Sequence, residues 1–277
     1  MSDHRSALFK EEGNRHFQAG EYARAEALYS KALISDPNNP TLYTNRAMAR
    51  LKLKQWESVI ADCDACLKLS PQSMKANYYL SQAHLPLHNY QDALDHAVKA
   101  HELCVQTGDR SLPAITTQVL RCKKEKWDDQ EKRRERQTSD LEREVVTMMQ
   151  RERDEALRDA TDAGDAGLHD IDAEWAAKID TVRAIFEKAR PKEEQRKVVP
   201  DWAIDDISFG FMLDPVITKS GKSYERASIL EHLKRNHADP RDPLTRDPLQ
   251  ISDLRPNLDL KQACAEFLDE NGWAADW

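Results

Sequence analysis

Lysine and asparagine side chains recur in the N-terminal third of the chain at positions that could bind a carboxylate. Lys10 and Asn14 lie one helical turn apart, and Asn45, Lys52 and Lys75 follow them. Lysine supplies charge and the asparagine amide supplies directed donors, and charge-assisted hydrogen bonds are roughly twice as strong as neutral ones. A single lysine on a helix is ordinarily solvent-exposed. The combination instead predicts a site for an acidic peptide.

The cysteines are the other side chains whose spacing could do chemistry. Cys63 and Cys66 form a C-x2-C pair, as in redox and metal sites. They fall, however, on columns of small residues in the repeat described next, so we interpret them as packing residues inside a helix. Cys264 lies at helical spacing with Leu260 and Phe267, and we interpret it as a core residue rather than a nucleophile.

Three helix pairs must position the lysines and asparagines. Tyr22, Trp56 and Tyr90 are separated by 34 residues, and other columns repeat in the same phase: Ala25, Val59 and Ala93; Tyr29, Cys63 and Ala97; Ala32, Cys66 and Ala100. A 34-residue period is the tetratricopeptide signature, in which antiparallel helix pairs stack and form a groove. We expect this domain to span residues 6–138, with a capping helix over residues 113–136.

The pattern changes to heptads over residues 139–195. Apolar residues alternate at spacings of three and four, with Lys178 as the one break: Leu168, Ile171, Trp175, Val182, Ile185 and Ala189. An earlier arm carries Leu141, Val145, Met148, Met149 and Leu157, and residues 162–167 supply a turn rich in Asp and Gly. The pattern predicts a helical hairpin or coiled coil. Because a lone hairpin buries little apolar surface, we expect it to form a homodimer.

A small α+β domain is predicted for residues 200–277. Residues 216–218 and 223–224 flank a Ser-Gly turn and predict a β-hairpin. A short helix is expected over residues 226–234, followed by a proline-rich loop and an amphipathic helix through residues 260–268. The whole chain is therefore expected to be mainly α.

The last domain resembles the U-box of ubiquitin ligases. The matching residues run through it in order: Ile207, Ser208, Phe209, Met212, residues 214–218, Gly221, residues 224–226, His232, Leu233, residues 243–246, Pro248, Leu249, Leu254, residues 256–258 and Lys261. The resemblance implies a RING-like fold without zinc, and after residue 198 only Cys264, His232 and His237 could be soft ligands, whereas a structural zinc site needs four. Neither a metal nor a cofactor is expected.

The same resemblance implies the residues that transfer ubiquitin without a covalent intermediate. The docking surface for a ubiquitin-conjugating enzyme would be formed by Ile207, Phe209, Met212, Pro243 and Leu249. Arg246, always charged and able to donate in a fork, would hold the conjugating enzyme and ubiquitin in the reactive pose.

The lysines and asparagines of the repeats resemble the carboxylate clamp of co-chaperones. This implies that Lys10, Asn14, Asn45 and Lys75, with Lys52 assisting and Tyr78 flanking, bind the terminal Glu-Glu-Val-Asp of cytosolic heat-shock chaperones. The implied substrates are the misfolded client proteins that the chaperones hold. One departure concerns the loop before the capping helix: Ser111 and Ala114 stand where the family presents an aromatic and an acidic residue.

Composition narrows the remaining classes of function. The net charge of −8 disfavours nucleic acid as the main partner, and the chain has no apolar run long enough to span a membrane. The start of the chain lacks the hydrophobic segment of a secretory signal, so a cytoplasmic location, alone or shared with the nucleus, is expected. Two functions remain open: a chaperone-linked ubiquitin ligase, or a non-enzymatic co-chaperone or adaptor whose U-box is degenerate.

Overall fold

The computed structural model describes residues 2–160, 164–189, 198–236 and 239–277. Contacts divide it into two compact units. The first contains Met1–Trp127 and Val199–Trp277, and the second contains Asp128–Val198.

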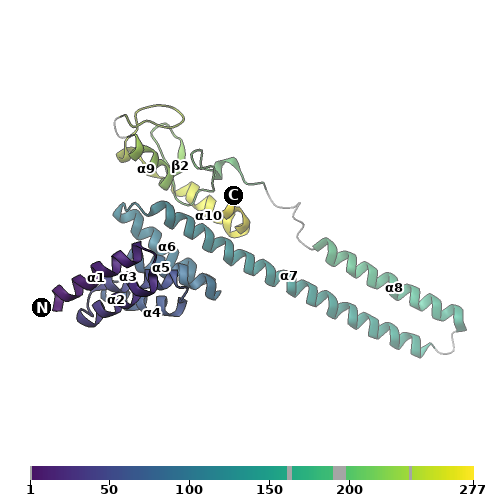
Figure 1. Ribbon diagram of the computed structural model, residues 1–277. Helices are drawn as coiled ribbons and strands as arrows, with labels where there is room; N and C mark the ends of the chain where they lie inside the picture. Colours follow the sequence, from purple (N-terminus) through teal and green to yellow (C-terminus); the bar gives the residue numbers. More distant parts are fainter. Residues whose placement is uncertain (1, 161–163, 190–197, 237–238) are drawn as a thin grey trace. The chain divides into compact units, whose positions relative to one another are not determined.

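Six helices of the first unit form three antiparallel pairs (Figure 1). They are α1 (Ser2–Gln18), α2 (Tyr22–Ser35), α3 (Pro40–Lys52), α4 (Trp56–Leu69), α5 (Met74–His84) and α6 (Tyr90–Thr107), with a 3-10 turn η1 (Leu85–Leu87) after α5. Every member of the small-residue columns is buried where the helices meet. The predicted tetratricopeptide architecture is therefore confirmed.

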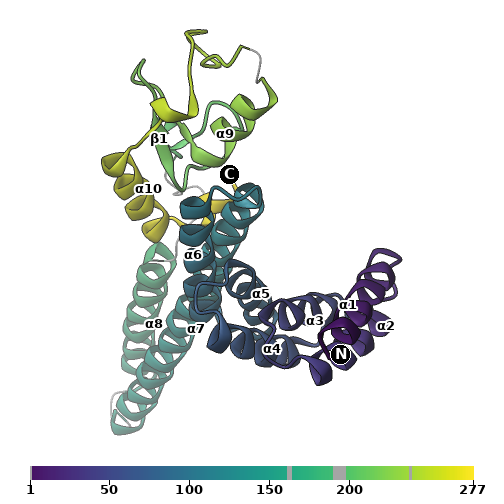
Figure 2. The same ribbon diagram turned by 90° about the vertical axis from the view of Figure 1, so that its left-hand side faces the viewer.

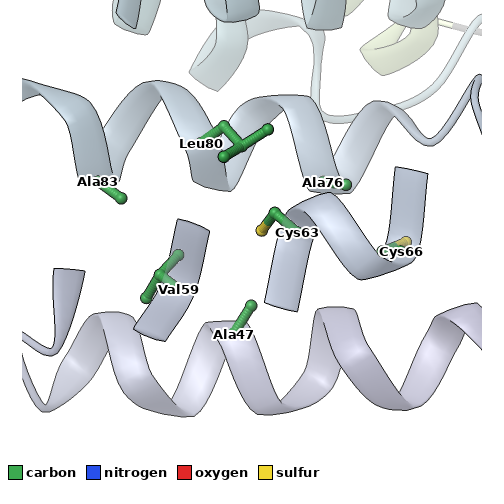
Figure 3. Close-up of a cluster of buried hydrophobic side chains, with 7 residues drawn as sticks. All are labelled: Ala47, Val59, Cys63, Cys66, Ala76, Leu80 and Ala83. Carbon is green, nitrogen blue, oxygen red and sulfur yellow. The ribbon is translucent and has the colours of Figure 1, made fainter. Parts of the chain in front are cut away.

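The centre of the array shows why small residues are required. The seven side chains in Figure 3 come from α3, α4 and α5 and pack into one cluster: Ala47, Val59, Cys63, Cys66, Ala76, Leu80 and Ala83. Cys63 and Cys66 lie inside it, and burial raises the pKa of both thiols. Their interpretation as packing residues is confirmed, since a thiol that resists ionisation is a poor nucleophile and a poor metal ligand.

A buried ion-pair network fixes α3, the helix that carries Asn45 and Lys52. Asp62 on α4 accepts from Arg46 at 2.5 Å and from Arg50 at 2.9 Å, and Arg50 also pairs with Glu26 on α2 at 2.7 Å. Removing one member of such a network typically costs about 3–5 kcal/mol because it leaves a buried charge uncompensated. The network thus sets the orientation of α3 against both neighbouring helices.

The helix after the repeats is longer than the sequence suggested. A capping helix over residues 113–136 and a separate arm from residue 141 were expected, but α7 runs without interruption over Leu112–Asp159. The reason is that neither Gly nor Pro occurs between Pro113 and Gly164. Ion pairs three and four residues apart, such as Arg133 with Asp129, stabilise the charged middle of the helix.

In the second unit, α8 (Gly164–Ala189) lies alongside the end of α7 in both Figure 1 and Figure 2. Arg153 on α7 and Asp172 on α8 approach to 3.8 Å. The turn expected over residues 162–167 is wrong for its second part, because α8 begins at Gly164; residues 162 and 163 lie outside the described part of the chain.

The predicted heptad face of α8 was partly wrong. Ile179 is 5% exposed and lies on the packed face, whereas Ile185 is 60% exposed and Ala189 is also exposed. A straight helix has 3.6 residues per turn, so a strict 3.5-residue repeat drifts off the packed face along its length. Lys178 points outward, with its ammonium group 4.7 Å from the centre of the Trp175 ring.

The C-terminal part of the first unit is a small sheet with two helices. Strand β1 (Pro215–Ile217) pairs antiparallel with β2 (Ser223–Glu225) and with β3 (Arg255–Pro256), in the order β2-β1-β3. The β-hairpin was predicted; β3, only two residues long, was not. Helices α9 (Arg226–Arg235) and α10 (Leu258–Glu270) follow, with short 3-10 turns η3 (Asp201–Ala203), η4 (Ile251–Asp253) and η5 (Gly272–Asp276).

Two general properties of the described residues bear on function. No helix among them combines the length and hydropathy that a membrane span requires. Within the same residues, no three His, Cys, Asp or Glu side chains are grouped so that they could hold a metal ion.

Candidate functional site

Asn14 and Asn45 meet between neighbouring repeats. Asn14 Oδ1 accepts from the Tyr29 hydroxyl at 2.8 Å and from Asn45 Nδ2 at 3.5 Å. Tyr29 can come this close because residue 13 is glycine: a Cβ there would lie 2.7 Å from the tyrosine ring. With its oxygen held by these donors, the Asn14 amide is fixed in orientation. Lys10 lies one turn before Asn14 on α1 and is partly exposed.

The remaining predicted clamp residues lie on α3 and α5. Lys52 and Lys75 are exposed, and Tyr78 is half-buried. The pKa of Asp109 is lowered, first by the Ser111 N–H, which donates to it at 2.8 Å, and to a smaller degree by the Ser111 side chain and the charge of Lys75. An acidic side chain therefore lies near Lys75, although Ser111 itself carries none.

A groove of about 1000 Å³ is lined by two of the predicted clamp residues, Lys52 and Tyr78, whereas Lys10, Asn14, Asn45 and Lys75 are not among its lining residues. Its walls come from α3, α5, the turns after them and the first part of α7: Met48, Leu51, Lys52, Trp56, Tyr78, Tyr79, Gln82, Leu85, Pro86, His88, Tyr90, Ala114, Thr117, Gln118, Arg121 and Glu125. Lys52 and Tyr78 line the groove together with Ala114. Gln82 and Arg121 were not predicted, although Gln82 follows Tyr78 by one helical turn.

In the U-box region, a first loop carries Phe209. Asp205 is fully buried, and its Oδ2 accepts from the Ser208 N–H at 2.9 Å and from the Ser208 hydroxyl at 2.7 Å. The Phe209 N–H donates to the Asp205 carbonyl at 2.8 Å, and Asp205 donates in turn to the carbonyl of Gly210 at 2.9 Å. Asp205 Oδ1 accepts from the Glu225 N–H at 3.0 Å, which fastens the loop to β2.

A second loop, which carries Arg246, repeats the same design. Asp242 is buried, the Arg246 N–H donates to its carbonyl at 2.9 Å, and the Asp242 N–H donates to Asp247 at 2.9 Å. The Asp242 carboxylate accepts from the Leu244 and Thr245 N–H groups and from the Tyr224 and Ser220 hydroxyls. Burial alone would raise its pKa, but these donors outweigh burial and lower it.

Phe209 and Arg246 are the exposed ends of the two loops, and both have left-handed backbone conformation, with φ of 57° and 63°. A side chain in this region costs roughly 1–2 kcal/mol, so the surrounding hydrogen bonds must hold it there. Phe209 is 73% exposed and the unpredicted Leu244 is 50% exposed. Ile207 and Pro243 are partly buried beside them.

Two predicted docking residues are placed differently. Met212 and Leu249 are each 2% exposed. Met212 packs with Phe211, Cys264 and other core residues, and Leu249 packs against the cluster that contains Tyr224. Their prediction as direct contacts is corrected: in this structure they support the surface from beneath, because the loops that carry them turn their apolar side chains into the core.

The carboxylates behind the loops differ in charge state. Burial raises the pKa of Asp214, but hydrogen bonds from Arg226 at 2.6 Å and Lys261 at 2.8 Å outweigh it, so the pKa is lowered. Burial raises the pKa of Glu225 to about 7, against the opposing hydrogen bonds from the Leu213 and Asp214 N–H groups. Glu225 is therefore a core carboxyl that is partly protonated near neutral pH.

Comparisons with known proteins find similarity both to the helical repeats and to the C-terminal domain. The family model of the U-box domain matches residues 199–273. The E3 ubiquitin-protein ligase CHIP of Arabidopsis thaliana is 29% identical over 267 residues, which cover 96% of this chain and 94% of that protein. RNA polymerase II-associated protein 3 of Rattus norvegicus is 35% identical over 103 residues, which cover 37% of this chain and 16% of that protein.

Among solved structures, the second TPR domain of human RPAP3 in complex with an HSP70 peptide is 26% identical. The match covers 44% of this chain and 98% of that domain, with a TM-score of 0.41. A U-box domain model thus matches the C-terminal part of the chain, and nearly the whole chain is similar to the E3 ubiquitin-protein ligase CHIP of Arabidopsis thaliana.

Proposed function

We propose that this chain is an E3 ubiquitin ligase that acts on proteins held by heat-shock chaperones. One observation supports the proposal: a groove lined by Lys52 and Tyr78 and a region that matches the U-box domain occur in the same chain. The first part binds the acidic C-terminal tail of a chaperone. The second recruits a ubiquitin-conjugating enzyme, and the misfolded client lies between them.

The clamp provides charge and direction for the tail. Lys10 and Lys75 supply cations, and the amides of Asn14 and Asn45 supply oriented donors to the terminal carboxylate and an acidic side chain. Lys52 and Tyr78 then contact the residues that precede the last residue of the tail along the groove. The small side chain of Ala114 and the position of Asp109 near Lys75 set how the upstream part of the tail is accommodated.

Ubiquitin transfer proceeds directly from the conjugating enzyme to the client. The client lysine Nζ attacks the carbonyl of the thioester, the new amide bond forms, and the cysteine thiolate of the conjugating enzyme leaves. Ile207, Phe209, Pro243 and Leu244 form the apolar contact, and Arg246 orients ubiquitin by hydrogen bonding. The ligase's own cysteines support this route, because all of them are buried and burial raises their thiol pKa values.

A homodimer is the proposed assembly. On the second unit, large apolar side chains remain at least about half exposed after the hairpin has formed: Leu141, Met148 and Ile185. Exposed apolar residues on a helical hairpin are suited to pairing with a second copy. The proposed location is the cytoplasm, alone or together with the nucleus, where the chaperones with such tails occur.

The test is discharge of ubiquitin from a panel of charged conjugating enzymes onto free lysine, with and without the chain. Stimulation by at least one member, together with ubiquitylation of a client that depends on the chaperone tail, is expected. A chain that binds the tail but stimulates no member of the panel would be a non-enzymatic adaptor.

A further inference from the structure

The buried carboxylate of Asp242 organises the loop that carries Arg246. Its Oδ1 accepts from the Tyr224 hydroxyl at 2.7 Å, the Leu244 N–H at 2.9 Å and the Thr245 N–H at 3.1 Å. Its Oδ2 accepts from the Ser220 hydroxyl at 3.0 Å. One side chain therefore joins the turn after β1, the middle of β2 and two peptide groups of the loop.

The backbone of Arg246, which follows these two peptide groups, is itself held on both sides. Its N–H donates to the Asp242 carbonyl at 2.9 Å, and its own carbonyl accepts from the Arg241 guanidinium at 3.0 Å. Arg246 nevertheless has φ of 63°, a conformation that glycine would adopt without strain. Strain of this kind persists only where surrounding contacts enforce it, so these contacts fix the point at which the guanidinium leaves the loop.

Resting on the proposed function, we infer that Asp242 is the positioning residue for ubiquitin transfer. It does not touch the conjugating enzyme, because it is 2% exposed. It fixes where the Arg246 side chain leaves the loop, and a displacement of about 1 Å in a positioning group can cost as much as a hundredfold in rate. Asp242 should therefore control the maximal rate of transfer through Arg246, in addition to the effect that its loop has on docking through Pro243 and Leu244.

Asp205 provides a matched comparison in the same domain. The main-chain carbonyl of each aspartate accepts from the N–H of the residue four positions later, each carboxylate accepts from at least one N–H group of its own loop, and both side chains are buried. Phe209 is apolar and exposed, and its loop carries no side chain proposed to orient ubiquitin, so this loop serves docking alone. Asp205→Ala should therefore change KM without lowering the maximal rate, whereas Asp242→Ala should lower the maximal rate.

The experiment measures discharge onto free lysine by the full chain as a function of conjugating-enzyme concentration. Asp242→Ala should lower the maximal rate by about ten- to a hundredfold, whatever its effect on KM through the docking residues Pro243 and Leu244. Asp242→Asn, which keeps the oxygen that binds three donors, should restore most of the rate. Asp205→Ala should raise KM instead. In an Arg246→Ala background, Asp242→Ala should cause no further loss.

The outcomes separate the inference from the proposed function. If the wild-type chain stimulates no conjugating enzyme, the proposed function fails. If the wild type is active and Asp242→Ala keeps the wild-type maximal rate, the positioning role is wrong. The role is also wrong if Asp242→Ala lowers the maximal rate further in the Arg246→Ala background. Should Asp242→Ala unfold the domain, Tyr224→Phe removes one donor and should still lower the maximal rate by about two- to tenfold. A wild-type rate for a folded Tyr224→Phe would then overturn the inference.

Discussion

Replacing Glu225 by glutamine should stabilise the U-box domain at pH 8 and leave it nearly unchanged at pH 5. Glu225 is 5% exposed, and its Oε2 accepts from the Leu213 and Asp214 N–H groups, both at 2.8 Å. Its Oε1 is buried without a partner among the described residues. Burial is the largest cause of its raised pKa, and the charges of Asp214 and Asp205 add to it.

The magnitude follows from the two pKa values. The carboxyl has a pKa near 4.5 in the unfolded chain and about 7 in the folded one, and this difference corresponds to roughly 3 kcal/mol. Below pH 4.5 the carboxyl is protonated in both the folded and the unfolded chain, so the ionisation of Glu225 does not reduce the free energy of unfolding. As the pH rises, the unfolded state releases its proton first, and the free energy of unfolding falls until the pH passes about 7.

Glutamine keeps the oxygen that accepts the two N–H groups but cannot ionise. Native-state hydrogen exchange of the β1 and β2 amides in the full chain, under increasing urea, measures the unfolding free energy of this domain. The wild type should lose roughly 3 kcal/mol relative to Glu225→Gln between pH 5 and pH 8. Glu266→Gln, at an exposed carboxylate on α10, is the control and should leave the slope unchanged. A constant difference between wild type and Glu225→Gln across this pH range would refute the reasoning.

Four further predictions concern binding, transfer, assembly and metal. Lys10→Ala should weaken binding of an acidic C-terminal chaperone peptide by about ten- to a hundredfold in calorimetry, and amidating the peptide's carboxylate should cost at least as much; unchanged affinity in both cases would exclude the clamp. Ile207→Ala should abolish discharge through loss of docking, typically about 2 kcal/mol or more, whereas Arg246→Ala should slow discharge while much of the docking remains. Met148→Lys should convert a dimer to a monomer in light scattering, and a monomeric wild type at micromolar concentration would contradict the dimer. Chelators should not change the thermal unfolding of residues 200–277 in the full chain, and stoichiometric zinc by elemental analysis would contradict the absence of a metal site.

The repeats could be predicted from sequence because their packing is local and periodic. Residues in one column occupy equivalent buried positions in successive repeats. The same kinds of side chain therefore recur every 34 residues, and Cys63 and Cys66 follow this period. The helices of the U-box were predicted for a similar reason. Ile229 and Leu233, for example, are buried at helical spacing on α9.

The predictions were wrong where the structure depends on the exact period of a helix or on contacts between residues distant in the sequence. The heptad pattern predicted that Ile185, and not Ile179, lies on the packed face of α8, because a small error in the period accumulates along a helix. Helix α7 is continuous because neither Gly nor Pro interrupts it after Pro113. Two separate helices were predicted because the pattern of apolar residues changes near residue 141. Met212 and Leu249 match a surface motif, but which of its apolar residues turn inward depends on loop conformation.

The side chains that could perform transfer were visible in the sequence, whereas those that hold them were not. Arg246 belongs to a recognisable motif, but the Tyr224 and Ser220 hydroxyls that fix its loop bind a carboxylate 18 and 22 residues further along the chain. No periodicity connects such residues, because their contacts are set by how the sheet packs against the loop. A buried donor without its acceptor costs about 1–3 kcal/mol, so each member of this network constrains the others. The conformation of the exposed arginine is therefore a property of the domain core, and substitutions that never touch the conjugating enzyme should alter transfer.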